Sequence, residues 1–207
     1  MKLLRLFSML TIAVLVVGLL GTTASAQNFA WTLHGSKTPL TTAGYTDLLK
    51  VNYFSNANSS GPDGTVRIMN PGSYAGDLCA QIYVFDPAQE MAECCACLVT
   101  PDGLRTLSVN TDLTSNTLTS TTLHMGSVSI VAGVVPSSGV CSPLNNYVYP
   151  TLRAWGTHIQ DLPTYTITET EYSDRALGPW NVNLLIDCYA IAIDGSGHGV
   201  CSCGSGD

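Results

Sequence analysis

Residues 78–97 read LCAQIYVFDPAQEMAECCAC, and this stretch decides what kind of fold the chain adopts. Across its first eight residues every second side chain is apolar: Leu78, Ala80, Ile82 and Val84. That period of two is typical of a β-strand that buries one face. We therefore expect a strand over residues 78–85 with its even-numbered face in the core, and Gln81 on a solvent-facing side.

The sequence on both sides of this strand alternates between turn signals and β-forming runs. Clusters such as residues 60–64 (SGPDG) and 70–72 (NPG) separate segments rich in Val, Ile, Thr and Tyr. Further strands are expected over residues 65–69, 104–109, 127–135, 152–159 and 165–170. This spacing predicts a mainly β, disulfide-stabilised, β-sandwich-like domain with a short C-terminal helix.

Local details can also be predicted. We expect residues 65–69 and 78–85 to form an antiparallel hairpin, and residues 87–93 to form one helical turn. Residues 111–122 hold six Thr and two Ser with no charge after Asp112, which indicates a loop or a sheet edge. The apolar residues of 179–193 have a spacing that fits either a buried strand or a helix. Pro179 suits a first helical position, and the polar Asn181, Asn183 and Asp187 suit the outer face of a helix. A short helix is therefore favoured.

The first 26 residues have the pattern of a cleavable export signal. Lys2 and Arg5 precede a largely apolar stretch, and Ala24-Ser25-Ala26 has the form of a cleavage site. Residues 27–207 then form a single β-rich extracytoplasmic domain, and cleavage lowers the formal net charge from −7 to −9. We expect the protein to be secreted, at the cell surface or in the periplasm.

All eight cysteines follow this leader: Cys79, Cys94, Cys95, Cys97, Cys141, Cys188, Cys201 and Cys203. An even count in an exported chain predicts a disulfide framework. A Zn²⁺ or Cu⁺ site with His198 is disfavoured because the spacing does not match structural zinc, so no metal or other cofactor is expected. On an extended strand Cys95 and Cys97 share one face and Cys94 takes the other, so Cys94 and Cys95 should have different partners. The sequence does not choose among the 105 possible pairings of eight cysteines.

Three segments carry a resemblance to other proteins. Residues 79–86 (CAQIYVFD), 93–97 (ECCAC) and 100–104 (TPDGL), with a Gly-Ser-Gly stretch and a final Cys-x-Cys, are similar to a group of uncharacterised secreted bacterial proteins. The similarity covers residues 65–205. It implies a shared disulfide-stabilised fold and no particular activity.

Composition excludes several classes of partner. Charged residues form 11% of the chain, and the few basic residues are scattered, so the clustered positive charge that nucleic acids and anionic membranes require is absent. No apolar run of membrane-spanning length follows the leader, so no membrane insertion is expected after its cleavage. The expected partner is an unknown extracellular ligand, a carbohydrate or a protein.

Candidate catalytic groups are few. Glu169 and Glu171 would lie on one face of a strand about 7 Å apart, a spacing that suits a glycosidase or a Ca²⁺ site, although a solvated face is the simpler interpretation. Ser196, His198 and Asp194 contain the residue types of a hydrolytic triad. They are too close together in the sequence for a usual triad, and His198 is expected in an exposed turn.

Aromatic residues offer a binding interpretation. Trp155, His158, Trp180 and the nine tyrosines provide rings for a sugar-binding platform, although core packing is the expected role of Trp155 and Trp180. His34 and His124 have no supporting partners in the sequence. The leading hypothesis is therefore a structural, adhesive or ligand-binding module, and the alternative is a secreted hydrolase that uses acidic residues such as Glu169 and Glu171.

Overall fold

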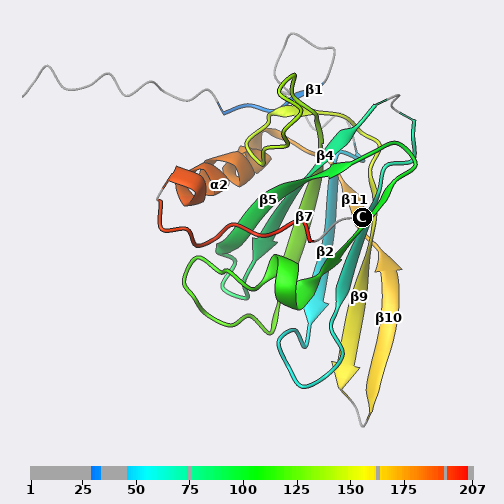
Figure 1. Ribbon diagram of the computed structural model, residues 1–207, viewed down its shortest axis with the longest axis vertical. Coiled ribbons are helices and arrows are strands. Elements are labelled where there is room, and N and C mark those ends of the chain that lie inside the picture. The colour runs from blue at the N-terminus through cyan, green and yellow to red at the C-terminus, as the bar shows by residue number, and fades with distance from the viewer. Residues whose placement is uncertain (1–28, 34–45, 74–75, 162–163, 194, 205–207) are drawn as a thin grey trace, which may run out of the picture.

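The computed structural model describes residues 29–33, 46–73, 76–161, 164–193 and 195–204. Two sheets face each other, and one helix lies outside the first of them (Figure 1). The expected export signal of residues 1–26, His34 and Asp194 lie outside the described residues. The described strands and helix confirm the expected mainly β, sandwich-like fold with a short C-terminal helix.

Sheet A is built on five antiparallel strands in the order β5-β4-β7-β2-β11. Short strand β8 pairs with β7 at Gly133, past the end of the β2–β7 pairing, and β1 pairs with β8 in parallel. The bounds are β1 (Thr32–Leu33), β2 (Leu49–Ser55), β4 (Leu78–Phe85), β5 (Met91–Val99), β7 (Met125–Val134), β8 (Tyr147–Val148) and β11 (Ser173–Arg175).

Sheet B is antiparallel, with the order β10-β9-β3-β6. Its strands are β3 (Thr65–Met69), β6 (Leu104–Ser108), β9 (Arg153–Asp161) and β10 (Tyr165–Glu171). A five-residue π-helix, η1 (Val109–Leu113), follows β6. All the expected strands exist, and the loop assignment for residues 111–122 is confirmed from residue 114 onward.

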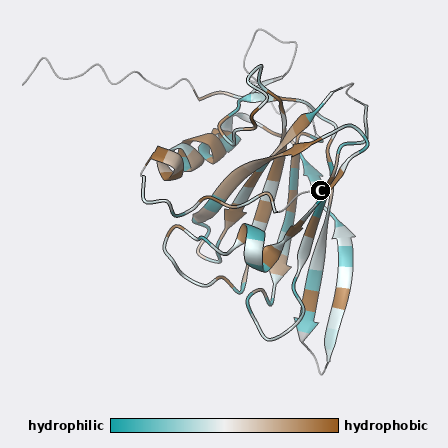
Figure 2. Cartoon of the chain, in the orientation of Figure 1, coloured by the Kyte–Doolittle hydropathy of each residue, from teal (hydrophilic) through white to brown (hydrophobic). Residues whose placement is uncertain are grey.

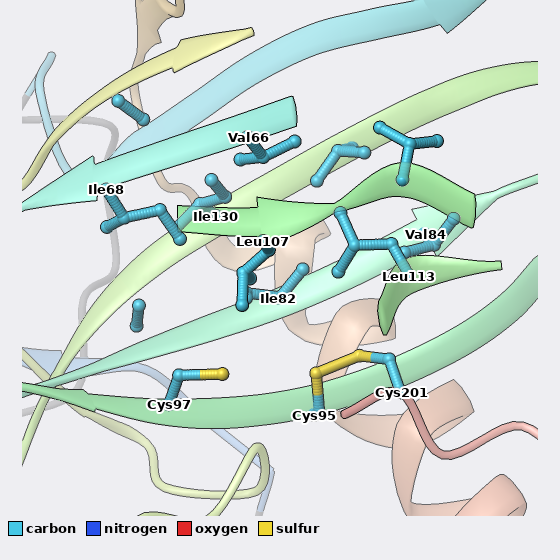
Figure 3. Close-up of a cluster of buried hydrophobic side chains, with 14 of the residues drawn as sticks. Val66, Ile68, Ile82, Val84, Cys95, Cys97, Leu107, Leu113, Ile130 and Cys201 are labelled. Atoms are coloured by element: carbon cyan, nitrogen blue, oxygen red, sulfur yellow. A yellow bond between two sulfur atoms is a disulfide. The ribbon is translucent and has the colours of Figure 1, made fainter. Parts of the chain in front are cut away.

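The main core lies between the two sheets. The even-numbered side chains of β4 pack there, as predicted, against residues of β3, β6 and β7. Figure 3 shows Ile82 and Val84 of β4 among Val66, Leu107 and Ile130. Burial of these β-branched and Leu side chains supplies the hydrophobic stabilisation that holds the sheets together.

A second apolar cluster covers the outer face of sheet A. It contains Tyr83 of β4, Val131 of β7 and Trp31, together with Leu185 and Cys188 of helix α2 (Asn183–Ile193). The helix follows a 3₁₀ turn, η2 (Pro179–Val182), in which Asn181 Oδ1 accepts a hydrogen bond from the Gly178 N–H at 2.9 Å. The helix predicted in this segment is confirmed.

Because of this cover, the expectation that β4 is open on one side is wrong. Gln81 is 0% exposed, and all of β4 except Phe85 is buried. The alternating pattern identified the core face correctly. It carried no information about the helix and the N-terminal segment that close the other face.

Two local expectations are also wrong. Strands β3 and β4 do not form a hairpin, because β3 pairs with β6 and β9 in sheet B while β4 pairs with β5 and β7 in sheet A. Residues 87–89 form a turn rather than a helical turn, and β5 begins at Met91. The register shifts between Val84 and Phe85, so the β4–β5 pair contains a bulge near this turn.

All eight cysteines are paired, as the even count predicted. The disulfides are Cys79–Cys141, Cys94–Cys188, Cys95–Cys201 and Cys97–Cys203. Cys94 faces helix α2 while Cys95 and Cys97 face the main core, which confirms that adjacent cysteines have different partners. Figure 3 shows the Cys95–Cys201 bridge beside the core side chains.

The Cys95–Cys201 and Cys97–Cys203 bridges fasten the C-terminal segment along the free edge of β5. The Cys94 N–H donates to the Gly199 carbonyl at 2.9 Å, and the Cys201 N–H donates to the Cys94 carbonyl at 3.3 Å. The segment therefore runs parallel to β5 and covers part of its backbone edge, which protects it from pairing with another chain. None of the helices formed by the described residues has the length and apolarity needed to cross a membrane.

Candidate functional site

The two glutamates that suggested hydrolysis lie on the open side of the molecule. Strand β10 is exposed at all seven positions. Glu169 forms an ion pair with Arg67, and Glu171 forms one with Arg153 at 2.8 Å between Oε1 and Nη2. Each carboxylate is thus paired with a guanidinium on an exposed sheet face, and this arrangement does not provide two carboxylates facing one substrate.

Among the described residues, the ring-bearing candidates Trp155, His158 and Trp180 do not share one surface. Trp180 is 89% exposed at the start of the helical segment, so its expected place in the core is wrong, and Trp155 is half-buried on β9. His158 is buried, and its ring stacks on Tyr53 with 4.1 Å between ring centroids. His158 Nε2 lies 2.6 Å from Thr170 Oγ1, and burial lowers the pKa of the imidazole. His158 therefore helps to join β9, β10 and β2.

The other histidine candidates lack a nucleophile–base geometry. Ser196 Oγ accepts a hydrogen bond from the backbone N–H of His198 at 3.2 Å, and both residues are exposed, as expected for a turn. His124 Nδ1 lies 2.9 Å from the Ala57 carbonyl, a contact that fixes the loop after β2. Among the residues that the structure describes, no three His, Cys, Asp or Glu side chains gather closely enough to hold a metal ion.

A polar pocket of about 300 Å³ is the strongest candidate site, and we call it the amide–hydroxyl pocket. It lies beside the loop after η1, where that loop meets the loop after β2 and the C-terminal segment. Ten described residues line it: Asn58, Asn110, Thr114, Ser115, Asn116, Thr117, Ser120, Thr121, Thr122 and His198. None of the ten is Asp, Glu, Lys or Arg, so its polarity comes from amides, hydroxyls and one imidazole.

Hydrogen bonds within the loops fix one wall of the pocket. Asn58 donates from its backbone N–H to Asn110 Oδ1 at 2.7 Å and from Nδ2 to Thr114 Oγ1 at 2.9 Å. Thr114 Oγ1 in turn donates to the Val109 carbonyl at 2.7 Å, and Thr117 Oγ1 donates to the Thr121 carbonyl at 2.8 Å. These contacts hold the loop in one conformation before any ligand arrives.

The opposite wall is fastened to the disulfide-bonded C-terminal segment. Asn116 Nδ2 donates to the carbonyls of Gly197 at 2.9 Å and Val200 at 3.1 Å. The backbone carbonyl of Asn116 accepts from the Gly199 N–H at 2.7 Å. Val200 is the residue before Cys201, which bridges to β5. The hydrogen bonds of Asn116 therefore connect this wall of the pocket to the segment that the Cys95–Cys201 disulfide holds.

A buried carboxyl group supports the pocket from behind. Glu93 of β5 is 0% exposed, and its Oε1 accepts a hydrogen bond from the Asn116 N–H at 2.9 Å. Its Oε2 has no hydrogen-bond partner among the described residues. Burial raises the pKa of Glu93 to about 7, so this carboxyl changes charge close to neutral pH.

Two pocket residues adopt backbone conformations that side chains usually avoid. Asn58 has φ 52° and Ser120 has φ 57°, both in the left-handed region. Asn tolerates this region, whereas for Ser it costs free energy that the surrounding contacts must offset. Such conformations concentrate at functional sites, which is a second reason to favour this pocket.

A larger hollow of about 460 Å³ lies near β2 and β11, but three of its four charged lining residues are already in ion pairs, and Asp47 is the fourth. Lys50, which is buried, forms an ion pair with Asp174, and Arg153 pairs with Glu171 on β10. An anionic ligand there would have to displace the carboxylate partner of Lys50 or Arg153. The amide–hydroxyl pocket imposes no such exchange.

Sequence reasoning found the loop but not the pocket. The dense Thr and Ser content of residues 111–122 was the available signal, and it marked a loop without indicating a site. Asn58, Asn110 and His198 come from three distant parts of the chain, and only the fold brings them together.

Comparisons with known proteins found no similar protein: no protein-family model matches the chain, nor does any curated protein or solved structure.

Proposed function

We propose that the protein is an exported binding module, rather than an enzyme, whose amide–hydroxyl pocket takes a neutral, hydroxyl-rich ligand such as a stretch of carbohydrate. The observation that carries this proposal is the uncharged lining of the pocket, in which nine of the ten residues are Asn, Ser or Thr.

The chemistry of the lining favours this ligand class. Hydroxyl and carboxamide groups both donate and accept hydrogen bonds, as the hydroxyls of a sugar do. The hydroxyls of a neutral polyhydroxy ligand can therefore find partners in the pocket both as hydrogen-bond donors and as acceptors. An ionic ligand would lose part of its hydration without gaining an opposite charge, which is costly.

The exported location is supported by two features of the chain. The signal pattern of residues 1–26 predicts export, and four disulfides form readily only in an oxidising compartment. Extracellular and periplasmic carbohydrate is the hydroxyl-rich polymer available there. A pocket whose walls are held by disulfides suits binding outside the cell, where a rigid site limits the ordering cost.

The test is a binding screen of the oxidised protein against neutral and anionic oligosaccharides, followed by calorimetry on the best ligand. Ser120→Gly removes a hydroxyl while keeping the left-handed backbone, and Thr122→Val removes a hydroxyl at nearly constant volume. Each loss should weaken binding by about 2- to 10-fold, the range of one hydrogen bond.

Thr106→Val is the matched control, because Thr106 is an exposed threonine on β6 of sheet B. It should leave the affinity unchanged. Preferential binding of anionic oligosaccharides, or equal affinity in Thr122→Val and the wild type, would overturn the proposal.

A further inference from the structure

Helix α2 carries an apolar stripe on its solvent side. Ile186 is 41% exposed and Ile193 is 58% exposed, and they flank the exposed Ala190 at helical spacings of four and three residues. Residues at these spacings lie on one face. The helix contains no basic residue, and its single charged residue is Asp187. Figure 2 shows that most of α2 is hydrophobic although it lies on the outside of the molecule.

A groove of about 410 Å³ runs beside this stripe, between α2 and the β4–β5 turn. Met91, Leu118 and Ile191 supply apolar lining. Glu90 and Asp187 supply two carboxylates, and no basic residue is among the groove's described lining. The stripe and the groove share Ala190, so together they form one surface, which we call the α2 surface.

We propose that the α2 surface docks a peptide segment of another protein that presents apolar side chains next to Lys or Arg. The apolar stripe and groove would bury the apolar side chains, and the two carboxylates would pair with the cation. This inference goes beyond the proposed carbohydrate binding and uses a different surface: Thr117 lines the amide–hydroxyl pocket, whereas the next residue, Leu118, lines the groove.

Charge determines which partner fits. Two carboxylates beside an apolar strip repel an anionic lipid surface and attract a cationic segment. Partial burial raises the pKa of Asp187, and a cationic neighbour would favour the ionised form of this carboxyl.

A second copy of this chain would have to exchange an existing contact to supply that cation from its described residues. All five basic side chains there already have partners: Lys50 with Asp174, Arg67 with Glu169, Arg153 with Glu171, Arg105 with the carbonyls of Cys203 and Leu98, and Arg175 with the carbonyl of Asp174. Three of these five cations are thus already in ion pairs, so the α2 surface favours a different, basic molecule as its occupant.

The experiment measures fluorescence anisotropy of a labelled 14-residue peptide made of Leu and Lys in an amphipathic helical pattern. Two altered peptides test which side chains are required. One has Glu in place of Lys, and the other has Ser in place of Leu. The Leu/Lys peptide should bind, and raising the salt from about 0.05 to 0.5 M should weaken it, because exposed charges are screened. Neither altered peptide should bind.

Two pairs of substitutions locate the site. Glu90→Gln with Asp187→Asn removes the charges, and Ile186→Ser with Ile193→Ser removes the apolar stripe. Each pair should weaken binding by about tenfold or more. Ile167→Ser with Glu169→Gln is the matched control on sheet B, since Ile167 is 55% exposed, and it should bind as the wild type does.

Three results would overturn this inference: equal binding of the Glu-containing peptide, unchanged affinity in both α2 pairs, or Ile186-dependent flotation of the protein with phosphatidylcholine vesicles. The last result would make the surface a membrane contact. All variants are first compared by circular dichroism, and oligosaccharide affinity is measured in parallel. Loss of peptide binding with intact oligosaccharide binding separates this inference from the proposed function.

Discussion

Strands β4 and β10 show the difference between the two sheets. Seven of the eight residues of β4 are buried, whereas all seven residues of β10 are exposed. Sheet A has the main core on one face and helix α2 with Trp31 on the other. Among the described residues, the outer face of sheet B carries ion pairs instead of a second apolar cluster.

The disulfides follow the same division. Each of the four takes one sulfur from β4 or β5, and none joins sheet B. Sheet A is thus the covered and cross-linked half, and sheet B is the half open to solvent. The comparison teaches that sheet A is buried on both faces, whereas sheet B is buried only on the face toward the main core. A substitution on the outer face of sheet B should therefore cost much less than one of the same chemical kind in sheet A.

The largest difference is expected between Ile82→Asp and Ile167→Asp. Ile82 is 0% exposed between the sheets, so a carboxylate there has no partner and should cost more than about 4 kcal/mol of unfolding free energy. Ile167 is 55% exposed on β10, so its change should cost less than about 1 kcal/mol. Urea denaturation of both variants measures the two values. Similar losses would remove the distinction between the sheets.

The next effect concerns the Cys94–Cys188 bridge, which ties α2 to the outer face of sheet A. Replacing both cysteines by Ala should lower the free energy of unfolding by about 2–4 kcal/mol, because the bridge restricts the unfolded chain. Hydrogen exchange of α2 should increase more than that of β10. If α2 exchanges as slowly as before, packing alone holds the helix in place.

A smaller, pH-dependent effect is expected at Glu93. Its pKa in the folded protein, about 7, lies above the value of 4.5 for a free glutamate. The contribution of Glu93 is therefore most favourable below pH 4.5 and is lost as the pH rises through 7. Glu93→Gln stays neutral at every pH. Above pH 7 its free energy of unfolding should therefore be about 1–3 kcal/mol higher than that of the wild type.

Glu169 of sheet B is the natural comparison, because its carboxylate is exposed and paired with Arg67. Glu169→Gln should change the free energy of unfolding by less than about 1 kcal/mol, the usual range for a surface ion pair. Parallel denaturation curves from pH 5 to pH 8 compare both variants. An effect of Glu169→Gln larger than that of Glu93→Gln would reverse the ranking of the sheets.

The sequence predicted the parts of the fold that are encoded locally. The alternation in residues 78–85 placed Ile82 and Val84 in the core, and the positions of Cys94 and Cys95 on a strand required different partners. Pro179 and the polar positions after it favoured the helix. Each of these inferences used neighbours within a few residues, where backbone geometry fixes which side chains share a face.

The other expectations were wrong because they concern features that depend on contacts between distant parts of the chain. The choice between pairing β3 with β4 or with β6 depends on how the sheets stack, which no turn sequence specifies. Gln81 looked like a surface residue because the covering helix lies a hundred residues further along the chain. The amide–hydroxyl pocket required Asn58, Asn110 and His198 to meet, and Trp180 shows that a large aromatic side chain does not by itself predict burial.

The central claim is that sheet A is closed on both faces, and the unfolding free energy of Gln81→Asp tests it most directly. Gln81 is 0% exposed on the outer face of β4, so a carboxylate there should cost several kcal/mol, close to the loss from Ile82→Asp on the inner face. Gln81→Met keeps the volume without the polar groups. It should be mild because Gln81 Nε2 has no hydrogen-bond partner among the described residues, and the Tyr83 hydroxyl, which donates to Gln81 Oε1 at 3.1 Å, keeps its hydrogen bond to the Pro143 carbonyl at 2.7 Å. If Gln81→Asp costs less than about 1 kcal/mol while Ile82→Asp is severe, β4 is open on one side and the claim is contradicted.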